Sequence, residues 1–306
     1  MKRILSKKMA KHSKFKQRME FMLLKMFYCY ITKFPKKMVA KSLDSIALNI
    51  GFRVGVRKKL VIAQITRAFP EYSAEKVLDV TKRMYLNMSK MIYEIFVIDK
   101  EELVKSITIQ GEENLLEAET LTNGVLLATG HYGNWELLGF FLLHRRIKIS
   151  AIFKRLSNPY MNSFFKDFRD GFGLDSIYKK NALRGIIKAL RDNRMIFFIH
   201  DQDGRKAGKV MPFLGSDASV FMGLAKISIK TKTPILPLYH IRTPEGKHII
   251  RFEKLIYPQQ EDNDDVRIMK KVNSSLEQVI KEYPELWFWL HKRWKSVDKK
   301  RGVKLG

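Results

Sequence analysis

The stretch that decides the fold reads Val125-Leu126-Leu127-Ala128-Thr129-Gly130-His131-Tyr132-Gly133-Asn134-Trp135-Glu136. Its first five residues form a short aliphatic run closed by a glycine, which is typical of a buried strand that ends in a turn. The residues after the turn predict a helix, with Asn134 as its N-cap. His131 therefore lies at the carboxyl end of a strand, and Glu136 lies in the first turn of the next helix. Open α/β sheets place their reactive groups at this edge.

His131 and Glu136 together favour acid–base chemistry. An imidazole held by a carboxylate can take a proton from an alcohol, because the carboxylate fixes the ring tautomer and stabilises the imidazolium. Gly130 and Gly133 bracket the histidine and permit a tight turn that another molecule can approach closely. The adjacent helix N-terminus adds N–H groups suited to an oxyanion or a phosphate. A lone histidine at a strand end is more often a structural hydrogen-bonding residue, but this setting favours a general base.

Strands and helices alternate after about residue 105. We expect strands over residues 125–129, 149–154, 195–200, 235–241 and 249–252, and helices over residues 135–143, 159–171, 181–192 and 218–230. This alternation predicts an α/β fold with a mixed, largely parallel sheet flanked by helices. Residues 40–100 show helical spacing, so a helical N-terminal part should pack against the sheet.

The net charge of +27 indicates a polyanionic partner, either nucleic acid or an anionic membrane face. Residues 1–40 hold 12 Lys or Arg and one Glu. The apolar part of this segment is interrupted by Lys25 and Lys33, so it favours a helix lying in the bilayer interface over a spanning one. The alternative is a helix that packs its apolar stripe on the domain. We expect residues 1–40 to be a basic amphipathic membrane-anchoring segment. The single Cys29 permits no intrachain disulfide.

Two further groups follow predicted strands and should line the same cleft. Asp201-Gln202-Asp203 comes directly after the run 195–200, and Lys154-Arg155 ends the run 149–154, with Asn158 shortly behind. Adjacent cations at a strand end suit contact with a phosphate or an oxyanion, and solvated surface charge is an equal alternative. Two carboxylates without a third acidic residue nearby are weak grounds for a metal site, so we expect none.

These blocks resemble the lipid A biosynthesis late acyltransferase family, a branch of the lysophospholipid acyltransferase superfamily, over about residues 57–295. The similarity lies in Thr129–Glu136, in Asp201-Gln202-Asp203 followed by 210–215, in Thr233-Pro234 with Pro237, and in Pro284 with 289–295. It implies a glycerol-3-phosphate acyltransferase-like fold and a cofactor-free enzyme that moves a fatty acyl group from acyl carrier protein to a hydroxyl of a lipid A precursor, its secondary acylation. It also implies the cytoplasmic face of a bacterial inner membrane, with residues 41–306 as the acyltransferase domain.

The resemblance also implies roles for individual residues. His131 would take the proton of the acceptor hydroxyl, and Glu136 would hold the imidazole. Either Lys154 or Arg155 would contact the thioester oxyanion or a phosphate of the glycolipid acceptor, because these two positions usually hold Arg and Pro in the family. The remaining substrate-binding residues would be Asn158, Asp201, Gln202 and Asp203.

Two other functions stay open at this point. The stretch Thr129–Glu136 does not identify the acceptor. The enzyme could therefore instead acylate a phospholipid, a glycosylated phosphoinositide or an ornithine lipid. The charge and the aromatic, basic residues 287–295 also permit a nucleic-acid-binding protein. The sequence carries no helix-turn-helix, zinc or RNA-binding motif, so we expect no nucleic acid partner.

Overall fold

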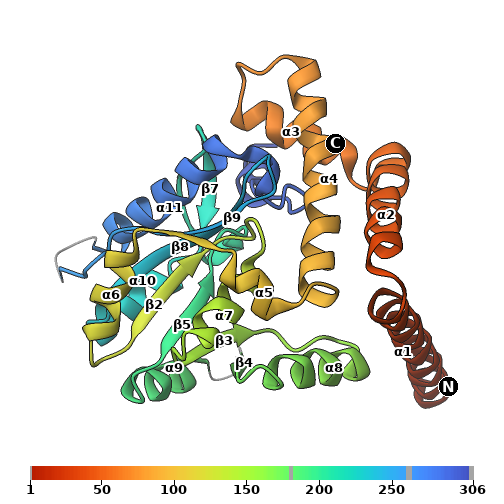
Figure 1. Ribbon diagram of the computed structural model, residues 1–306, viewed down its shortest axis with the longest axis horizontal. Helices are drawn as coiled ribbons and strands as arrows, with labels where there is room; N and C mark the ends of the chain where they lie inside the picture. Colours follow the sequence, from red (N-terminus) through yellow and green to blue (C-terminus); the bar gives the residue numbers. More distant parts are fainter. Residues whose placement is uncertain (1, 179–181, 260–263, 303–306) are drawn as a thin grey trace.

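A seven-stranded sheet lies at the centre of the molecule (Figure 1). The computed structural model describes residues 2–178, 182–259 and 264–302. The strand order is β1-β9-β8-β2-β5-β3-β4. Every neighbouring pair in it is parallel except β8 with β9, which is antiparallel. The prediction of an α/β fold with a mixed, largely parallel sheet is confirmed.

The strands of this sheet are β1 (Thr108–Gln110), β2 (Val125–Thr129), β3 (Ile149–Phe153), β4 (Asp175–Tyr178), β5 (Met195–Ile199), β8 (Ile235–Arg242) and β9 (His248–Phe252). A separate hairpin consists of β6 (Lys209–Phe213) and β7 (Ser216–Val220). The helices are α1 (Lys2–Lys33), α2 (Lys36–Ile46), α3 (Lys58–Ala68), α4 (Ala74–Phe96), α5 (Lys100–Lys105), α6 (Glu112–Thr120), α7 (Trp135–His144), α8 (Pro159–Asp170), α9 (Ala182–Arg191), α10 (Gly223–Thr231), α11 (Asp264–Glu282) and α12 (Lys295–Lys300). A π-helical stretch over Ala47–Gly55 joins α2 to α3.

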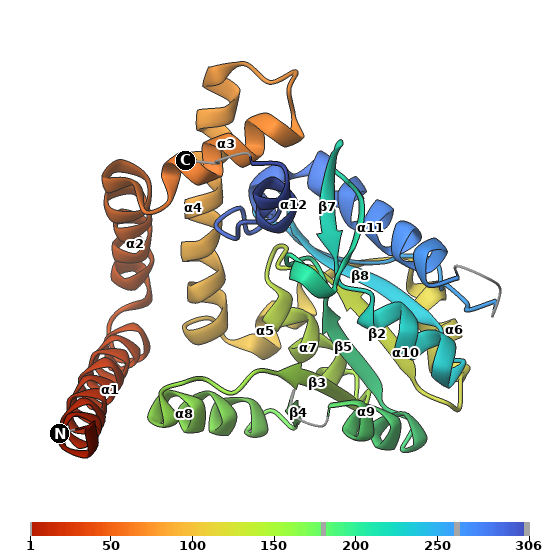
Figure 2. The same cartoon turned by 180° about the vertical axis from the view of Figure 1, so that it is seen from behind.

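Helices cover both faces of the sheet, which Figures 1 and 2 present from opposite sides. Apolar residues of α5, α6 and α7 pack on one face. Residues of α9, α10 and α11 pack on the other. Strands β2 and β8 are buried along their whole length as a result. This explains why they read as continuous apolar runs in the sequence instead of alternating ones.

The N-terminal helices extend to one side of the sheet domain, with α4 between the domain and the pair α1 and α2 (Figure 2). Ser73 caps α4, because its hydroxyl accepts a hydrogen bond from Lys76 N. The inner side of α4 packs with α3, α11 and the C-terminal segment in one cluster that includes Met84, Leu276 and Trp289. The expected helical part before the sheet is therefore present.

One predicted helix is wrong in its first half. We expected a helix over 218–230, but Ser216–Val220 forms β7 and the helix begins at Gly223. The reason lies in the turn before it, where Leu214 and Gly215 both have positive φ values, of 46° and 72°. That turn folds 216–220 back onto β6 as an antiparallel hairpin. Asn181, the first residue of another predicted helix, lies outside the described residues.

The aromatic and basic C-terminal segment belongs to the core. Trp287, Trp289 and Trp294 are all buried. The side-chain amide of buried Gln64 donates to the carbonyl oxygens of Trp289 and His291. These rings therefore pack inside the protein, where neither a membrane interface nor a stacked base can reach them.

Candidate active site

The loop between β2 and α7 carries His131 and is fixed by its backbone. Phe288 N donates to His131 O at 2.9 Å, and Gly133 N donates to Leu286 O at 2.9 Å. Gly133 has a φ of 57°, and a Cβ at this position would lie 2.0 Å from the carbonyl oxygen of His240. Only glycine lets the loop pass so close to β8. Asn134 caps α7 as expected, because its side chain accepts from Leu137 N.

Asp201 is the carboxylate that holds His131. The parallel pairing of Thr129 with Ile199 brings the residues after β2 and β5 side by side. Asp201 Oδ1 lies 2.7 Å from His131 Nδ1, and Oδ2 accepts hydrogen bonds of 2.8 Å from both His131 N and Trp287 Nε1. Asp201 is buried, and these donors hold its pKa well below the usual range even though burial alone would raise it.

This geometry prepares His131 to act as a base. Because Nδ1 faces a carboxylate, it carries the ring proton, which leaves Nε2 as the acceptor. Nε2 has no hydrogen-bond partner among the described residues, and the side chain is 21 % exposed. Burial lowers the pKa of His131, but the charge and hydrogen bond of Asp201 raise it more, aided by Glu136. The pKa is therefore above its ordinary value of 6.5.

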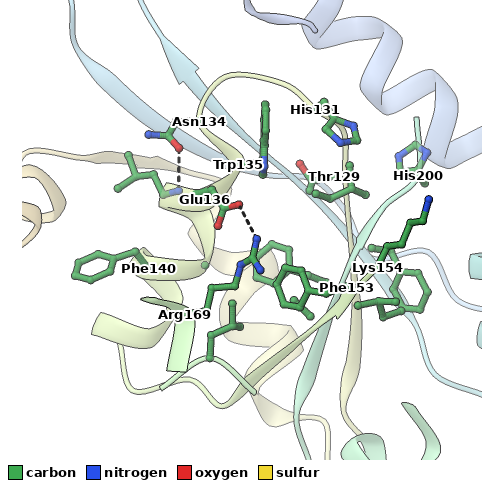
Figure 3. Close-up of a pocket in the computed structure, with 18 of the residues that line it drawn as sticks. Thr129, His131, Asn134, Trp135, Glu136, Phe140, Phe153, Lys154, Arg169 and His200 are labelled. Carbon is green, nitrogen blue, oxygen red and sulfur yellow. Dashed lines mark hydrogen bonds and ion pairs between the residues drawn. The ribbon is translucent and has the colours of Figure 1, made fainter. Parts of the chain in front are cut away.

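Glu136 does not hold the imidazole, contrary to our expectation. Its carboxylate points toward Arg169 of α8, with 4.0 Å between Oε1 and Nη2 (Figure 3). The N-cap turn at Asn134 directs the first turn of α7 toward α8, whereas strand pairing supplies a closer carboxylate to the His131 ring. Burial raises the pKa of Glu136, and Arg169, Trp135 and His131 oppose that shift.

A pocket of about 570 Å³ lies beside His131. Its lining includes the consecutive strand residues Ala151, Ile152 and Phe153, although successive side chains of a strand point to opposite faces of the sheet. The pocket therefore wraps around the carboxyl edge of β3 and β5. On one side its wall is formed by Phe140, Leu143 and Phe172, and on the other by Leu183, Ile186 and Ile227. This apolar lining suits an alkyl chain.

Several polar and charged side chains interrupt this apolar wall. Lys154 and Arg169 line the pocket together with Thr129, His131 and Glu136 (Figure 3). Gln202 lines it as well. The Arg169 guanidinium carbon lies 3.9 Å from the ring centroid of Phe153, which fixes its position. Within the described residues, no group of three or more His, Cys, Asp or Glu side chains is arranged to hold a metal ion.

Residues 6–296 match the family of bacterial lipid A biosynthesis acyltransferases. The chain belongs to this family. It is 21% identical over 275 residues to the phosphatidylinositol mannoside acyltransferase of Mycobacterium tuberculosis, covering 84% of this chain and 85% of that protein. It is 22% identical over 265 residues to the lipid A biosynthesis palmitoleoyltransferase of Escherichia coli, covering 81% of this chain and 84% of the relative.

Among solved structures, the chain is similar to the 1-acyl-sn-glycerophosphate acyltransferase PlsC of Thermotoga maritima. The TM-score is 0.36 and the sequence identity 15%, over 83% of this chain and 100% of that one.

The other predicted site residues of this family member divide into two groups. Lys154 and Gln202 line the pocket, whereas Arg155 does not and lies against the Tyr178 ring at 4.8 Å. Asn158 does not line the pocket but caps α8 and donates to Gln17 O and Glu20 Oε2 of α1. Asp203 accepts from Ser296 N and Oγ and so anchors α12. Asp201, expected to bind substrate, has both oxygens occupied behind His131.

The sequence reasoning missed three pocket residues. Arg169 was not singled out, although it lies against the Phe165 ring and lines the pocket beside Phe168, and a cation is unusual in such apolar surroundings. His200 directly precedes Asp201 and was counted only as the end of a strand. Burial lowers the pKa of His200 to about 4, so this ring is neutral, and neither of its nitrogens has a partner. Glu94 of α4 lines the pocket as well, but it belongs to no motif that would have identified it in the sequence.

Asp201→Asn tests the pairing with His131. Removing the charge lowers the pKa of His131, so the fall in rate at acid pH should move to lower pH, while the maximal rate drops by about 10²–10⁴-fold. Acyl transfer measured across pH with purified enzyme reports both changes. Asp203→Asn, which alters a carboxylate that contacts Ser296 and not His131, should leave the acid limb in place. An unchanged acid limb in Asp201→Asn would contradict the pairing.

Proposed function

We propose that this protein transfers a fatty acyl group from acyl carrier protein to a hydroxyl of a lipid A precursor. One observation carries the proposal: the His131–Asp201 pair at the edge of the apolar pocket. The pair supplies a base for an alcohol, and the pocket offers apolar surface to an alkyl chain. Family membership supports acyl transfer in general, and the description of the family supports lipid A as the acceptor.

The proposed reaction has two proton steps. His131 Nε2 takes the proton of the acceptor hydroxyl while its oxygen bonds to the thioester carbonyl carbon. The carbonyl electrons move to oxygen, and they return as the carbon–sulfur bond breaks. The leaving thiolate then takes the proton from the imidazolium, which Asp201 stabilises throughout without being protonated. Because a thioester is already activated, no acyl-enzyme is needed.

The cations of the pocket have a place in this scheme. Lys154 or Arg169 would stabilise the oxyanion or bind a phosphate of the acceptor. Glu136 would remain a catalytic residue in a different role, because it would orient Arg169, the cation that it faces. Arg155, which lies against Tyr178 and does not line the pocket, is the weaker candidate for the cationic role.

A second acceptor class has specific support. Three mycobacterial phosphatidylinositol mannoside acyltransferases match 80–84% of this chain, as much as the lipid A enzymes do. Their named substrate, a phosphatidylinositol mannoside, could present a hydroxyl to His131 in the same way. A glycosylated phosphoinositide is therefore the runner-up acceptor.

Loss of the base should nearly abolish transfer. His131→Ala should lower turnover by about 10²–10⁴-fold with folding intact. His144→Ala changes a histidine that pairs with Glu101 on the surface and should keep the wild-type rate. The assay offers lauroyl-, myristoyl- or palmitoyl-acyl carrier protein to a lipid A precursor or to a phosphatidylinositol mannoside, with products read by mass spectrometry. Normal turnover by His131→Ala would refute the base, and transfer only to the mannoside would refute the acceptor.

The proposed place of action is an anionic membrane surface, the cytoplasmic face of the bacterial inner membrane. No described helix combines the length and apolar character needed to cross a bilayer. α1 has two apolar sides instead. Its inner side, with Phe21, Tyr28 and Ile31, packs against α8 and α4.

The outer side of α1 carries large exposed apolar side chains at helical spacing: Phe15, Met19, Met22, Leu23 and Met26. Exposed Lys16, Arg18 and Lys25 flank them. An apolar stripe between cations favours a helix that lies in the headgroup region of anionic lipid. The exposed Met38, Ile46 and Ile50 continue the apolar character into α2 and the π-helical stretch. This surface supports residues 1–40 as the membrane-anchoring segment.

Cys29 allows a direct test of this surface. It is exposed, the chain has no other cysteine, and it lies seven residues after Met22 on the same side of α1. A polarity-sensitive fluorophore on Cys29 should shift to the blue with vesicles that contain anionic lipid, and less with neutral vesicles. Met22→Gln with Met26→Gln should weaken binding, whereas Leu116→Gln, at another exposed apolar residue on α6, should not. Equal binding by all three proteins would contradict the assignment.

A further inference from the structure

A closed circuit of three hydrogen bonds and one longer ionic contact begins and ends at Asn134, behind the loop that carries His131. The backbone N–H of Asn134 donates to His240 Nδ1 at 2.9 Å, and its side-chain Nδ2 donates to Glu94 Oε2 at 2.9 Å. His240 Nε2 lies 2.9 Å from His248 Nδ1, and His248 Nε2 faces Glu94 Oε1 at 3.9 Å. Three elements, α4, β8 and β9, therefore meet at the residue that caps α7.

The circuit is built on a buried ion pair. Arg242 Nε donates to Glu94 Oε1 at 2.7 Å, and its Nη2 donates to Glu94 Oε2. Both side chains are only 5 % exposed, and Arg242 also donates to Asn87. A buried pair of this kind is weak support for stability, because two buried hydrocarbons can replace it at little cost. The structural effect of the pair is to fix the positions of the polar side chains that contact Glu94, namely Asn134 and His248.

The donors and acceptors require one protonation pattern in the two histidines. His240 Nδ1 accepts from Asn134, so the proton of neutral His240 is on Nε2. That proton is donated to His248 Nδ1, so His248 in turn carries its proton on Nε2, toward Glu94. If His248 Nδ1 gained a proton, its N–H would point at the N–H on His240 Nε2. Moving the His240 proton to Nδ1 would remove that clash, but the moved proton would then point at the backbone N–H of Asn134.

We propose that Glu94, Arg242, His248 and His240 are positioning residues that fix Asn134, and through it His131 and the first turn of α7, by means of this circuit. The proposal rests on the proposed role of His131 as the base. It assigns to α4 a direct part in the active site, since Glu94 both joins the circuit and lines the pocket.

The circuit should fail in acid. Burial lowers the pKa of His240 and of His248, helped for both by the Arg242 charge, while Glu94 raises that of His248. A histidine whose pKa is lowered by folding keeps its contribution to stability above pH 6.5 and loses it as the pH falls toward the lowered pKa. The circuit should therefore be intact at neutral pH and should open only as the pH falls toward the lowered pKa values of the two histidines, first through the more exposed His248.

Two variants of His240 separate positioning from simple packing. His240→Phe keeps the ring but leaves the Asn134 N–H without an acceptor, and it should lower kcat by about 10²-fold with little change in KM for the acyl donor. His240→Asn places an oxygen near the position of Nδ1 and should recover much of the lost rate. Myristoyl-acyl carrier protein and a lipid A precursor serve as probes, with unfolding measured in parallel. A folded His240→Phe variant with wild-type kcat would overturn the proposal.

Nitrogen-15 NMR of the histidine rings tests the circuit without any substrate. At neutral pH, His240 should show a protonated Nε2 and an unprotonated Nδ1. In His248→Gln, whose amide can accept from His240 but does not titrate, the acid change of the His240 signals should move to lower pH. The opposite tautomer, or an unmoved transition, would overturn the circuit. A protein that passes this test yet transfers no acyl group would contradict only the proposed function.

Discussion

The hydrogen bonds of Asp201 are the constraint on which the rest of the site depends. A buried carboxylate is costly unless donors surround it, and Asp201 takes its donors from two other segments, the loop after β2 and the C-terminal segment at Trp287. Trp287 is itself held among Trp289, Trp294 and Phe213. The aromatic C-terminal segment therefore acts on His131 indirectly, because it fixes the carboxylate that holds the imidazole ring.

The central strands could be predicted from the sequence because burial on both faces leaves continuous apolar runs. β2 was predicted to the residue, and β3 and β5 to within one residue. The short edge strands β1 and β4 were missed, since three or four partly exposed residues carry no such run. The hairpin β6–β7 was missed because its register depends on a turn whose positive φ at Leu214 no sequence rule indicates.

Some residues of the site could be predicted from the sequence because they follow predicted strands. His131, Lys154 and Gln202 were found because each follows a strand, and parallel strands end at one edge. The partner of His131 was wrongly assigned to Glu136, since spacing along the chain does not reveal which strands are neighbours. Asp201 lies beside His131 only because β5 pairs with β2, although β3 and its helix α8 come between them in the chain. The contacts that Glu94 of α4 makes with the site could not be predicted either, because no local sequence pattern marks this residue.

Asn158 links the N-terminal helix α1 to α8, which lines the pocket. Its amide joins the first turn of α8 to α1, and Phe21 of α1 stacks on Tyr160 beside it. The other end of α8 supplies Phe168 and Arg169 to the pocket wall. With the outer side of α1 in the headgroup region, as proposed, one helix would separate the lipid from the pocket. An acceptor whose alkyl chains stay in the bilayer could then reach His131 by its polar head alone, past Arg169 at the end of α8.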